Sequence, residues 1–374
     1  MPKPRITASL VNLLLVVTTG LLLVLLWQLR SLLVALMIAV VIAATLAPII
    51  DRAENLRLPR WLAVIMVYLG LIAGFAGVGV LIGPTVVEQI QRLIQSLPTY
   101  IDVLRSLVEN LAIRLGLSQP EAITQISQLF DTPALTGWVI RASQQLLVRS
   151  YDVTKGILGG FFILLLSLLL SGYMLSGSET LIKGIVSLFP YPWNERLEGQ
   201  VKPASQRMGG YIQGRVLVSA ILAVAISIGL TLLGLSDFAL ALGVIAGVTD
   251  LIPFLGPILG AVPALIVALA QGGLTFFWVL LLFAIVQNVE TYVLDPLLVG
   301  SSVKVHPLYQ LLAVLGGTQV LGLVGAIIVP PWVAGVAVVL QNLYLKPKQL
   351  AEQEAARAAL VTTETPKALP VNRC

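Results

Sequence analysis

The chain has 374 residues, of which 57% are hydrophobic and 11% are charged, and its formal net charge is +5. A soluble domain carries about a quarter charged residues, so this composition and a mean hydropathy of +0.96 predict an integral membrane protein. The positive balance is typical of cytoplasmic loops that face anionic lipid, and we expect the lipid bilayer, not nucleic acid, as a partner. The chain has a single cysteine, Cys374, and a single histidine, His306. These counts exclude an internal disulfide and a multi-histidine metal site, and we expect neither a metal nor a cofactor.

The first apolar run begins after Lys3 and Arg5 and extends from about residue 6 to residue 27. It is longer than the core of a cleaved signal peptide, which has about 7–15 apolar residues, so it predicts a retained transmembrane helix. The other predicted single spans cover roughly residues 32–50, 61–82, 156–175, 216–233 and 274–292. The apolar segments 238–271 and 308–345 are each too long for one span. Together these elements predict an all-α polytopic membrane protein with about eight transmembrane helices and a Gly/Pro-broken re-entrant hairpin.

Residues 84–155 differ, because charged and polar residues alternate there with apolar ones at helical spacing. This pattern predicts an insert of amphipathic helices, which could form a solvated bundle, lie at the membrane interface or make an oligomer contact. We therefore expect four regions in the chain. They are three transmembrane helices in 1–83, the amphipathic region 84–155, a transmembrane core in 156–345 and a cytoplasmic tail in 346–374.

Basic residues in short loops indicate which side of the membrane is cytoplasmic. Loops 51–60, 176–215 and 300–307 and the tail with Lys346 and Lys348 are all basic and can all be cytoplasmic. This arrangement requires the segment 238–271 to enter and leave the membrane on one side. A re-entrant hairpin or two short crossings would satisfy it.

The segment Gly247 to Ala264 reads GVTDLIPFLGPILGAVPA. Its helix-breaking residues fall within eleven positions and are Pro253, Gly256, Pro257, Gly260 and Pro263. Proline removes a backbone donor, and non-helical backbone at membrane depth is tolerated only where protein buries it or where it lines a wet cavity. Two half-helices that meet at an unwound turn are typical of a transporter's solute site. The segment 308–345 is also interrupted by glycine and proline, which hints at an internal repeat.

Two carboxylates lie near apolar depth, where ionisable residues are functional candidates by default. Asp250 directly precedes the break, where its charge would add to the negative end of a half-helix and suit a proton or small cation. Glu290 follows Gln287 and Asn288, and residues 287 and 290 share a helix face. An interfacial Asp250 and a solvated or salt-bridged Glu290 are the alternatives. The predicted substrate- or ion-binding residues are Asp250, Pro253, Gly256, Pro257, Gly260, Pro263, Asn288 and Glu290.

We expect no enzymatic activity and assign no catalytic residue. The sequence has no Gly-x-x-x-x-Gly-Lys-Ser/Thr phosphate loop, no Gly-x-Ser-x-Gly nucleophile elbow and no His-Glu-x-x-His zinc motif. Any driving force must therefore come from a gradient or a partner protein.

The stretch Asp250 to Ala264 resembles the central motif of the AI-2E family of bacterial transporters. Tyr211-Ile-Gln-Gly214 and the stretch from Glu290 to Pro307, with Asp295-Pro296 and His306-Pro307, are similar to further parts of that family. The resemblance implies a multi-pass permease of the cell inner (plasma) membrane with cytoplasmic termini, and it leaves room for a homo-oligomer. Members of the family are linked to export of the signal autoinducer-2, and others to sodium, lithium or proton antiport.

Three hypotheses follow. The first is a permease that exports a small polar solute, such as autoinducer-2, through a site at the 250–263 break. The second is Na⁺(Li⁺)/H⁺ antiport with Asp250 or Glu290 as the carrier. The third is a non-transporting membrane scaffold that binds partners through residues 84–155. The broken hairpin favours the first two, because a scaffold does not need unwound backbone in lipid.

Overall fold

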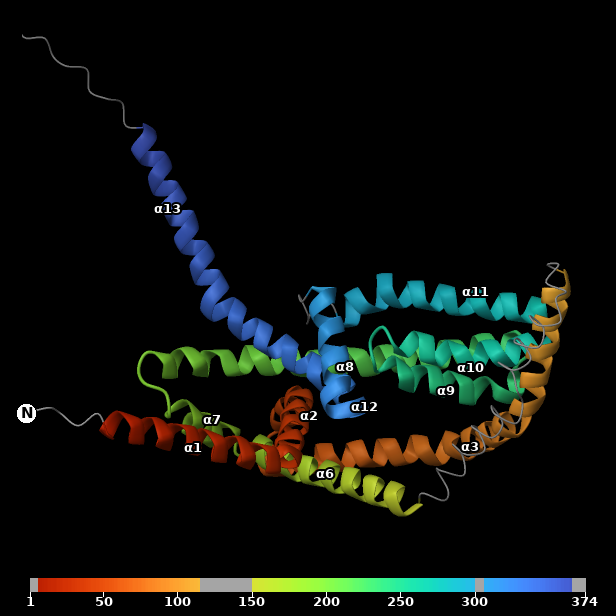
Figure 1. Cartoon of the computed structure of the whole chain (residues 1–374), viewed down its shortest axis with the longest axis horizontal. Coiled ribbons are helices and arrows are strands. Elements are labelled where there is room, and N and C mark those ends of the chain that lie inside the picture. The colour runs from red at the N-terminus through yellow and green to blue at the C-terminus, as the bar shows by residue number, and fades with distance from the viewer. Residues whose placement is uncertain (1–5, 115–149, 300–305, 365–374) are drawn as a thin grey trace, which may run out of the picture.

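The computed structural model describes residues 6–114, 150–299 and 306–364, and within these ranges it contains helices and turns but no strand. The helices are α1 (Ile6–Gln28), α2 (Arg30–Glu54), α3 (Arg60–Arg114), α6 (Ser150–Ser176), α7 (Ser178–Val186), α8 (Trp193–Leu232), α9 (Ser236–Asp250), α10 (Gly256–Gln271), α11 (Gly273–Val289), η1 (Glu290–Val299), α12 (Pro307–Leu340), η2 (Gln341–Leu345) and α13 (Lys346–Glu364). The elements η1 and η2 are π-helical. The predicted all-α class is confirmed (Figure 1).

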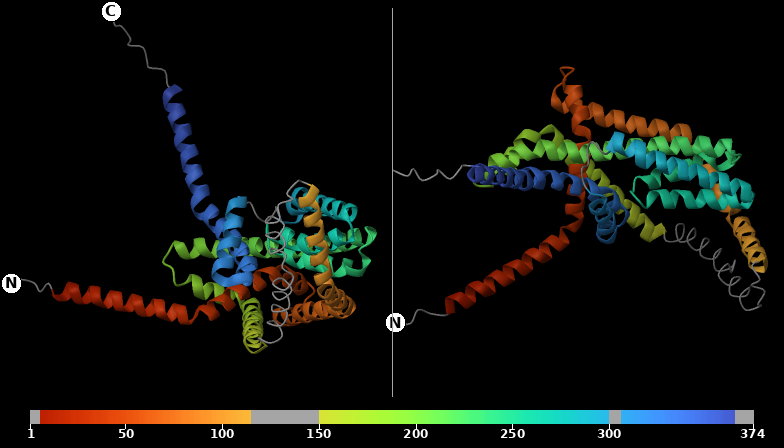
Figure 2. Two further views of the ribbon diagram at one scale, coloured as in Figure 1. Left: turned by 45° about the vertical axis from the view of Figure 1, so that its right-hand side comes forward. Right: turned by 90° about the horizontal axis from the view of Figure 1, so that it is seen from above.

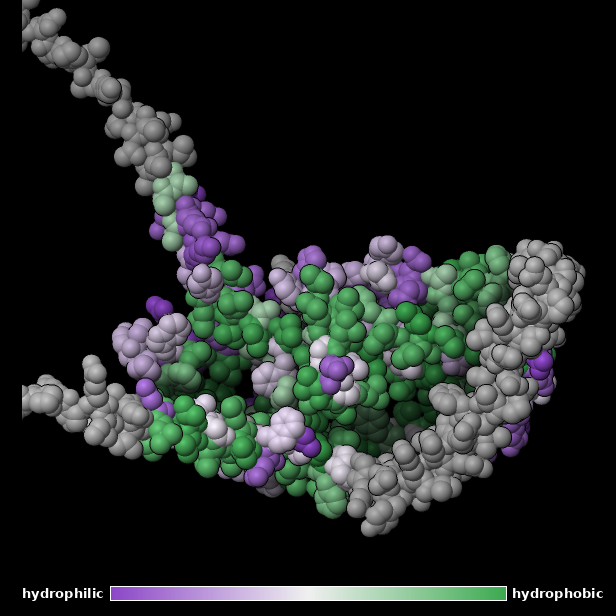
Figure 3. Space-filling model, viewed as in Figure 1, coloured by the Kyte–Doolittle hydropathy of each residue, from purple (hydrophilic) through white to green (hydrophobic). Residues whose placement is uncertain are grey.

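The helices expose a large apolar surface, as expected of a protein that faces lipid. Six helical stretches of the described chain are long and apolar enough to cross a membrane, and α10 is a shorter apolar helix. Green, apolar residues cover most of the body in Figure 3, whereas purple, polar residues gather on α13. Figures 1 and 2 show α1 and α13 extending away from this body. The multi-pass membrane architecture therefore rests on both length and surface.

Two helices are longer than the sequence predicts. α3 continues past its expected end near residue 82 and includes Pro84 and Pro98, and α8 includes residues 193–215, which were expected to form a loop. The sequence becomes amphipathic at residue 84 without ending the helix, and proline inside a helix bends it where it does not break it. Figure 1 shows α3 curving around the right-hand end of the body. The predicted boundary at 83/84 thus lies inside a helix. Residues 115–149 of the amphipathic region lie outside the described ranges, so the division into four regions stays a prediction.

The amphipathic part of α3 is anchored on the start of α9. The ring of Tyr100 meets that of Phe238 edge-on, with centroids 6.5 Å apart, and Leu93 belongs to the same buried cluster. The side chain of Gln89 also accepts a hydrogen bond of 2.8 Å from the backbone N–H of Ala241 and donates to the carbonyl of Ser236 at 3.4 Å. These contacts couple α3 to the helix that leads into the break.

Gln89→Leu is expected to lower the thermal unfolding temperature in detergent by a few degrees. The variant removes one short hydrogen bond and one long one, and such bonds contribute about 0.5–1.5 kcal/mol each. Gln91→Leu is the matched control, because Gln91 lies two residues away on the same helix and is exposed. Equal unfolding temperatures for the two variants would show that the Gln89 contacts contribute nothing.

The break between α9 and α10 is present where the sequence predicts it. α9 ends at Asp250 and α10 begins at Gly256, with Pro257 in its first turn. The two helices have 15 and 16 residues, or roughly 24 Å each at 1.5 Å per residue, which is less than the ~30 Å core of a bilayer. A Cβ on Gly260 would contact Ala246 and one on Gly256 would contact Thr249, so the helices run antiparallel. They form the predicted hairpin.

The long apolar helix α12 is also a hairpin. Gly322, with φ 65° and ψ −150°, interrupts its helical backbone. A Cβ added to Gly317 would strike the backbone of Gly325, although residues eight apart in a straight helix are separated by about 12 Å. The chain therefore folds back at Gly322, and Ile252, in the turn of the first hairpin, packs against the second through Val314 and Ala326. The two interrupted segments meet inside the protein.

Candidate functional site

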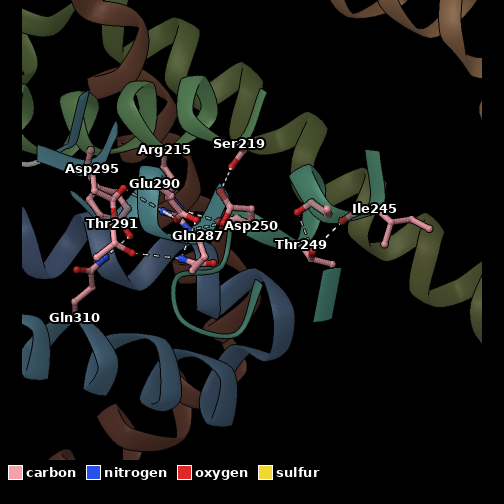
Figure 4. Close-up of polar contacts among 12 residues, drawn as sticks. Arg215, Ser219, Ile245, Thr249, Asp250, Gln287, Glu290, Thr291, Asp295 and Gln310 are labelled. Carbon is pink, nitrogen blue, oxygen red and sulfur yellow. Dashed lines mark hydrogen bonds and ion pairs between the residues drawn. The ribbon is translucent and has the colours of Figure 1, made fainter. Parts of the chain in front are cut away.

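The centre of the site is Arg215, which projects from α8 and is only 4% exposed. Its Nη2 donates to Oδ1 of Asp250 at 2.9 Å, and its Nη1 donates to Oε1 of Glu290 at 2.9 Å. Its Nε donates to the backbone carbonyl of Asp250 at 2.7 Å. One guanidinium therefore joins α8 to the end of α9 and the start of η1 (Figure 4).

A third carboxylate completes this group. Oδ1 of Asp295 lies 3.4 Å from Nη1 of Arg215, and its side chain is 40% exposed, so it connects the buried charges to the surface. We call Arg215, Asp250, Glu290 and Asp295 the Arg215 cluster. The Ser219 hydroxyl donates to Oδ2 of Asp250 at 3.1 Å. Among the described residues, every buried side-chain nitrogen or oxygen has a hydrogen-bond partner.

Local backbone structure explains why these side chains converge. The C-terminal end of a helix carries partial negative charge, which disfavours a carboxylate at the last residue of α9. Arg215 offsets this, because it binds both the carbonyl and the carboxylate of Asp250. A π-helix bonds residues five apart, so η1 places Glu290 and Asp295 on one face, toward Nη1 of Arg215. The Nε2 of Gln287 donates to Oε2 of Glu290 at 3.0 Å, as the shared helix face predicts.

The cluster has more negative than positive charge. Asp250 and Glu290 are 2% and 3% exposed, so two buried carboxylates share one buried guanidinium. When all groups are ionised, the buried part has one negative charge in excess, and Asp295 adds a second. An unbalanced charge in an apolar environment is costly, so this arrangement favours binding of a proton or a cation.

A small cavity lies beside the two buried carboxylates. Asp250, Gln287 and Glu290 form its polar side, and the rest of its wall includes Pro257 and Phe283. Its volume is about 20 Å³, and a cavity needs roughly 10–15 Å³ to hold a water molecule. It can therefore hold a proton on water, or a very small ion, but not an organic solute in this conformation.

No group of three or more carboxylates, histidines or cysteines in residues 6–114, 150–299 and 306–364 is arranged to hold a metal ion. Arg215 lies between its three carboxylates and binds one oxygen of each. A proton needs only one carboxylate oxygen, whereas a metal cation needs several oxygen ligands. This arrangement is therefore better suited to a proton than to a metal ion.

The predicted site residues take different positions. Asp250 and Glu290 come together at Arg215, and Pro257 lines the adjoining cavity. Asn288 is exposed and donates to the carbonyl of Ala284, away from the cluster. Three other predicted residues shape the hairpin: Pro253 is buried in its turn, Gly256 is buried at the start of α10, and Gly260 is buried against α9. Pro263 lies within α10 and is half-buried.

Sequence analysis did not single out Arg215, Ser219 or Asp295. In the sequence, Arg215 ends the basic segment 176–215, and Asp295 stands within the motif from Glu290 to Pro307. Two features of the sequence indicate Arg215. It directly precedes an apolar run, and two carboxylates at membrane depth require a nearby cation. The signal for Asp295 is weaker, because only a π-helix aligns it with Glu290.

Comparison with known proteins places this geometry in context. The model of a family described as "AI-2E family transporter" matches residues 13–345. The Bacillus subtilis protein named "Putative transport protein YrrI" is 28% identical over 81% of this chain and 84% of its own length. A second B. subtilis protein, named "Putative transport protein YueF", is 26% identical over 79% of this chain and 80% of its own. The Mycobacterium tuberculosis protein named "Putative transport protein MT0215" is 25% identical over 83% of each chain.

Proposed function

The chain belongs to the AI-2E transporter family, and from that premise we propose that it is a secondary transporter with its coupling site at the Arg215 cluster. In this proposal the cluster binds a proton or a small cation, and the solute passes the 250–263 break. We also assign it to the cell inner (plasma) membrane. The observation that carries the proposal is that Asp250 and Glu290 are both buried and share one guanidinium.

The charge of the cluster would change with its occupancy. A bound proton or cation removes the buried excess of negative charge, and release restores it. The occupied cluster, without excess charge, is therefore stable in a closed, dry conformation. The empty cluster, with its excess negative charge, favours a conformation that admits water. Asp295 is half-exposed, and it contacts the same Nη1 of Arg215 as Glu290 does. It therefore offers a route by which a proton could pass between the surface and Glu290.

For the transported solute we propose a small polar molecule, with autoinducer-2 as the first compound to test. The break between α9 and α10 supports this choice, because two half-helices that meet at an unwound turn are typical of a transporter's solute site. The cavity beside the carboxylates holds about one water, so passage of such a solute requires the hairpins to separate.

Na⁺(Li⁺)/H⁺ antiport is the second candidate. The cluster suits the proton of that exchange better than the metal ion, but the water-sized cavity beside Asp250 and Glu290 is large enough for a small ion, whereas an organic solute does not fit it. In that case the ion is itself the transported species, and no larger path is needed. A non-transporting scaffold has less support, because it gives no reason to bury two carboxylates against one arginine.

The test is flux in proteoliposomes, with and without an imposed proton or sodium gradient. We expect gradient-driven flux in the wild type and a loss of at least tenfold in Asp250→Asn and Glu290→Gln. Asp237→Asn is the matched control, because it makes the same change at an exposed position on α9.

The pattern of transport distinguishes the candidates. Autoinducer-2 flux that follows the gradient supports the coupled permease, and sodium flux without autoinducer-2 supports antiport. If autoinducer-2 flux is the same with and without the gradient, and the same in wild type and Asp250→Asn, the cluster has a structural role only. Absence of all flux from folded protein would favour the scaffold.

A further inference from the structure

A second polar site lies about two helical turns along α8 from Arg215, on the side of Arg207. It is a pocket of about 350 Å³ between α8 and the junction of α12, η2 and α13, and its wall includes Gln206, Arg207, Gln341, Asn342 and Lys346. Small-molecule sites are typically about 300–1,000 Å³ in volume. The wall residues carry two positive charges and three amides, and no acidic residue is among them.

The π-helix η2 builds one side of this pocket. The backbone N–H of Lys346 donates to the carbonyl of Gln341, five residues earlier. In an α-helix these two residues would face different directions, but the wider π turn aligns them, and both line the pocket. The side chain of Asn342 donates to Oε1 of Gln200 on α8 at 2.8 Å, which joins η2 to α8. Short π segments occur often at functional sites.

The pocket lies where the chain changes from apolar to polar, as it does at a membrane interface. The apolar part of α12 ends at Leu340, and polar α13 begins at Lys346, where Figure 1 shows the chain crossing α8. Tyr344, two residues before Lys346, is exposed. Aromatic residues of this kind concentrate at headgroup level.

From these observations we propose that the pocket binds a phosphate group, carried by an anionic phospholipid of the adjacent leaflet. The basic and amide groups supply donors for phosphate oxygens, and the absence of acids in the wall removes the main repulsion. Both sides of the pocket are basic and lie next to apolar helical stretches, which by the positive-inside rule indicates the cytoplasmic face, where anionic lipid is concentrated. A bound headgroup would hold the start of α13 against α8.

The test measures binding of three soluble probes to the full chain in detergent by calorimetry. The probes are dihexanoyl-phosphatidylglycerol, dihexanoyl-phosphatidylcholine and inorganic phosphate. We expect phosphatidylglycerol to bind at least fivefold more tightly than phosphatidylcholine, because one basic charge near a membrane is worth about fivefold in affinity.

Two variants locate the site. Lys346→Gln is expected to weaken phosphatidylglycerol binding about fivefold, and Gln206→Glu to weaken it further by placing a negative charge in the wall. Both positions are exposed, so the fold is expected to survive. Lys348→Gln is the matched control, since it removes the same charge two residues away, where Lys348 pairs with Glu352 instead.

The outcomes separate the sources of the phosphate. Binding of phosphatidylglycerol that responds to Lys346→Gln but not to Lys348→Gln supports the lipid site. Binding of inorganic phosphate with the same response supports the same chemistry from a soluble source. If no probe binds, or if the two lysine variants behave alike, the proposal is overturned.

Discussion

Arg215→Leu is expected to destabilise the protein by about 3–5 kcal/mol, which is the usual effect of leaving a buried charge without its partner. The substitution removes the guanidinium from Asp250 and Glu290, which are otherwise surrounded by protein. Thermal unfolding and the yield of monodisperse protein in detergent measure the effect. Arg215→Lys should lie between wild type and leucine, because lysine keeps the charge but lacks the fork that reaches three carboxylates.

A combined variant separates stability from transport. Arg215→Leu together with Asp250→Asn and Glu290→Gln removes the buried charges as a set, and replacing a whole ionic group is often neutral for stability. We expect this variant to regain most of the lost unfolding temperature but not gradient-driven flux. Such non-additivity is the signature of residues that act as one network. An unfolding temperature for Arg215→Leu equal to that of wild type would contradict the cluster as described.

The sequence predicted the hairpin break well because its signal is local. Proline and glycine determine backbone geometry over a few residues, so the end of α9 at Asp250 and the start of α10 at Gly256 follow from the sequence alone. The same holds for the interruption of α12 at Gly322, because the sequence predicts a Gly/Pro interruption within the segment 308–345. The membrane class follows from composition for a similar reason.

The Arg215 cluster could not be derived in the same way, because its members come from three separate elements. Asp250 was recognised from its position before the break, but its partner lies 35 residues earlier, on α8. Pairing across such a distance depends on helix packing, which short-range patterns do not encode. The extents of α3 and α8 differ from the prediction for a related reason: a change between apolar and polar sequence predicts a helix end, although both helices continue through the change.

Gly317→Ala is expected to be strongly destabilising, while the same change at the neighbouring Gly316 is not. A Cβ at Gly317 would overlap the carbonyl of Gly325 on the other arm of the α12 hairpin. Backbone cannot move aside as a side chain can, so the arms must separate, and overpacking of this kind typically costs about 1–3 kcal/mol. At Gly316 a Cβ meets nothing within 4 Å, so alanine there should stabilise the helix by about 0.5–1 kcal/mol.

The pair of variants therefore predicts changes of opposite sign at adjacent residues. Thermal unfolding in detergent should show a lower transition temperature for Gly317→Ala and an equal or higher one for Gly316→Ala. Equal behaviour of the two would mean that the arms of α12 are not in contact at Gly317. The proteoliposome assay adds a functional consequence, because Ile252 in the first hairpin packs on Val314 and Ala326 of the second. Separating the arms of α12 shifts the surface that supports the turn after Asp250, so Gly317→Ala should also reduce flux in the fraction that remains folded.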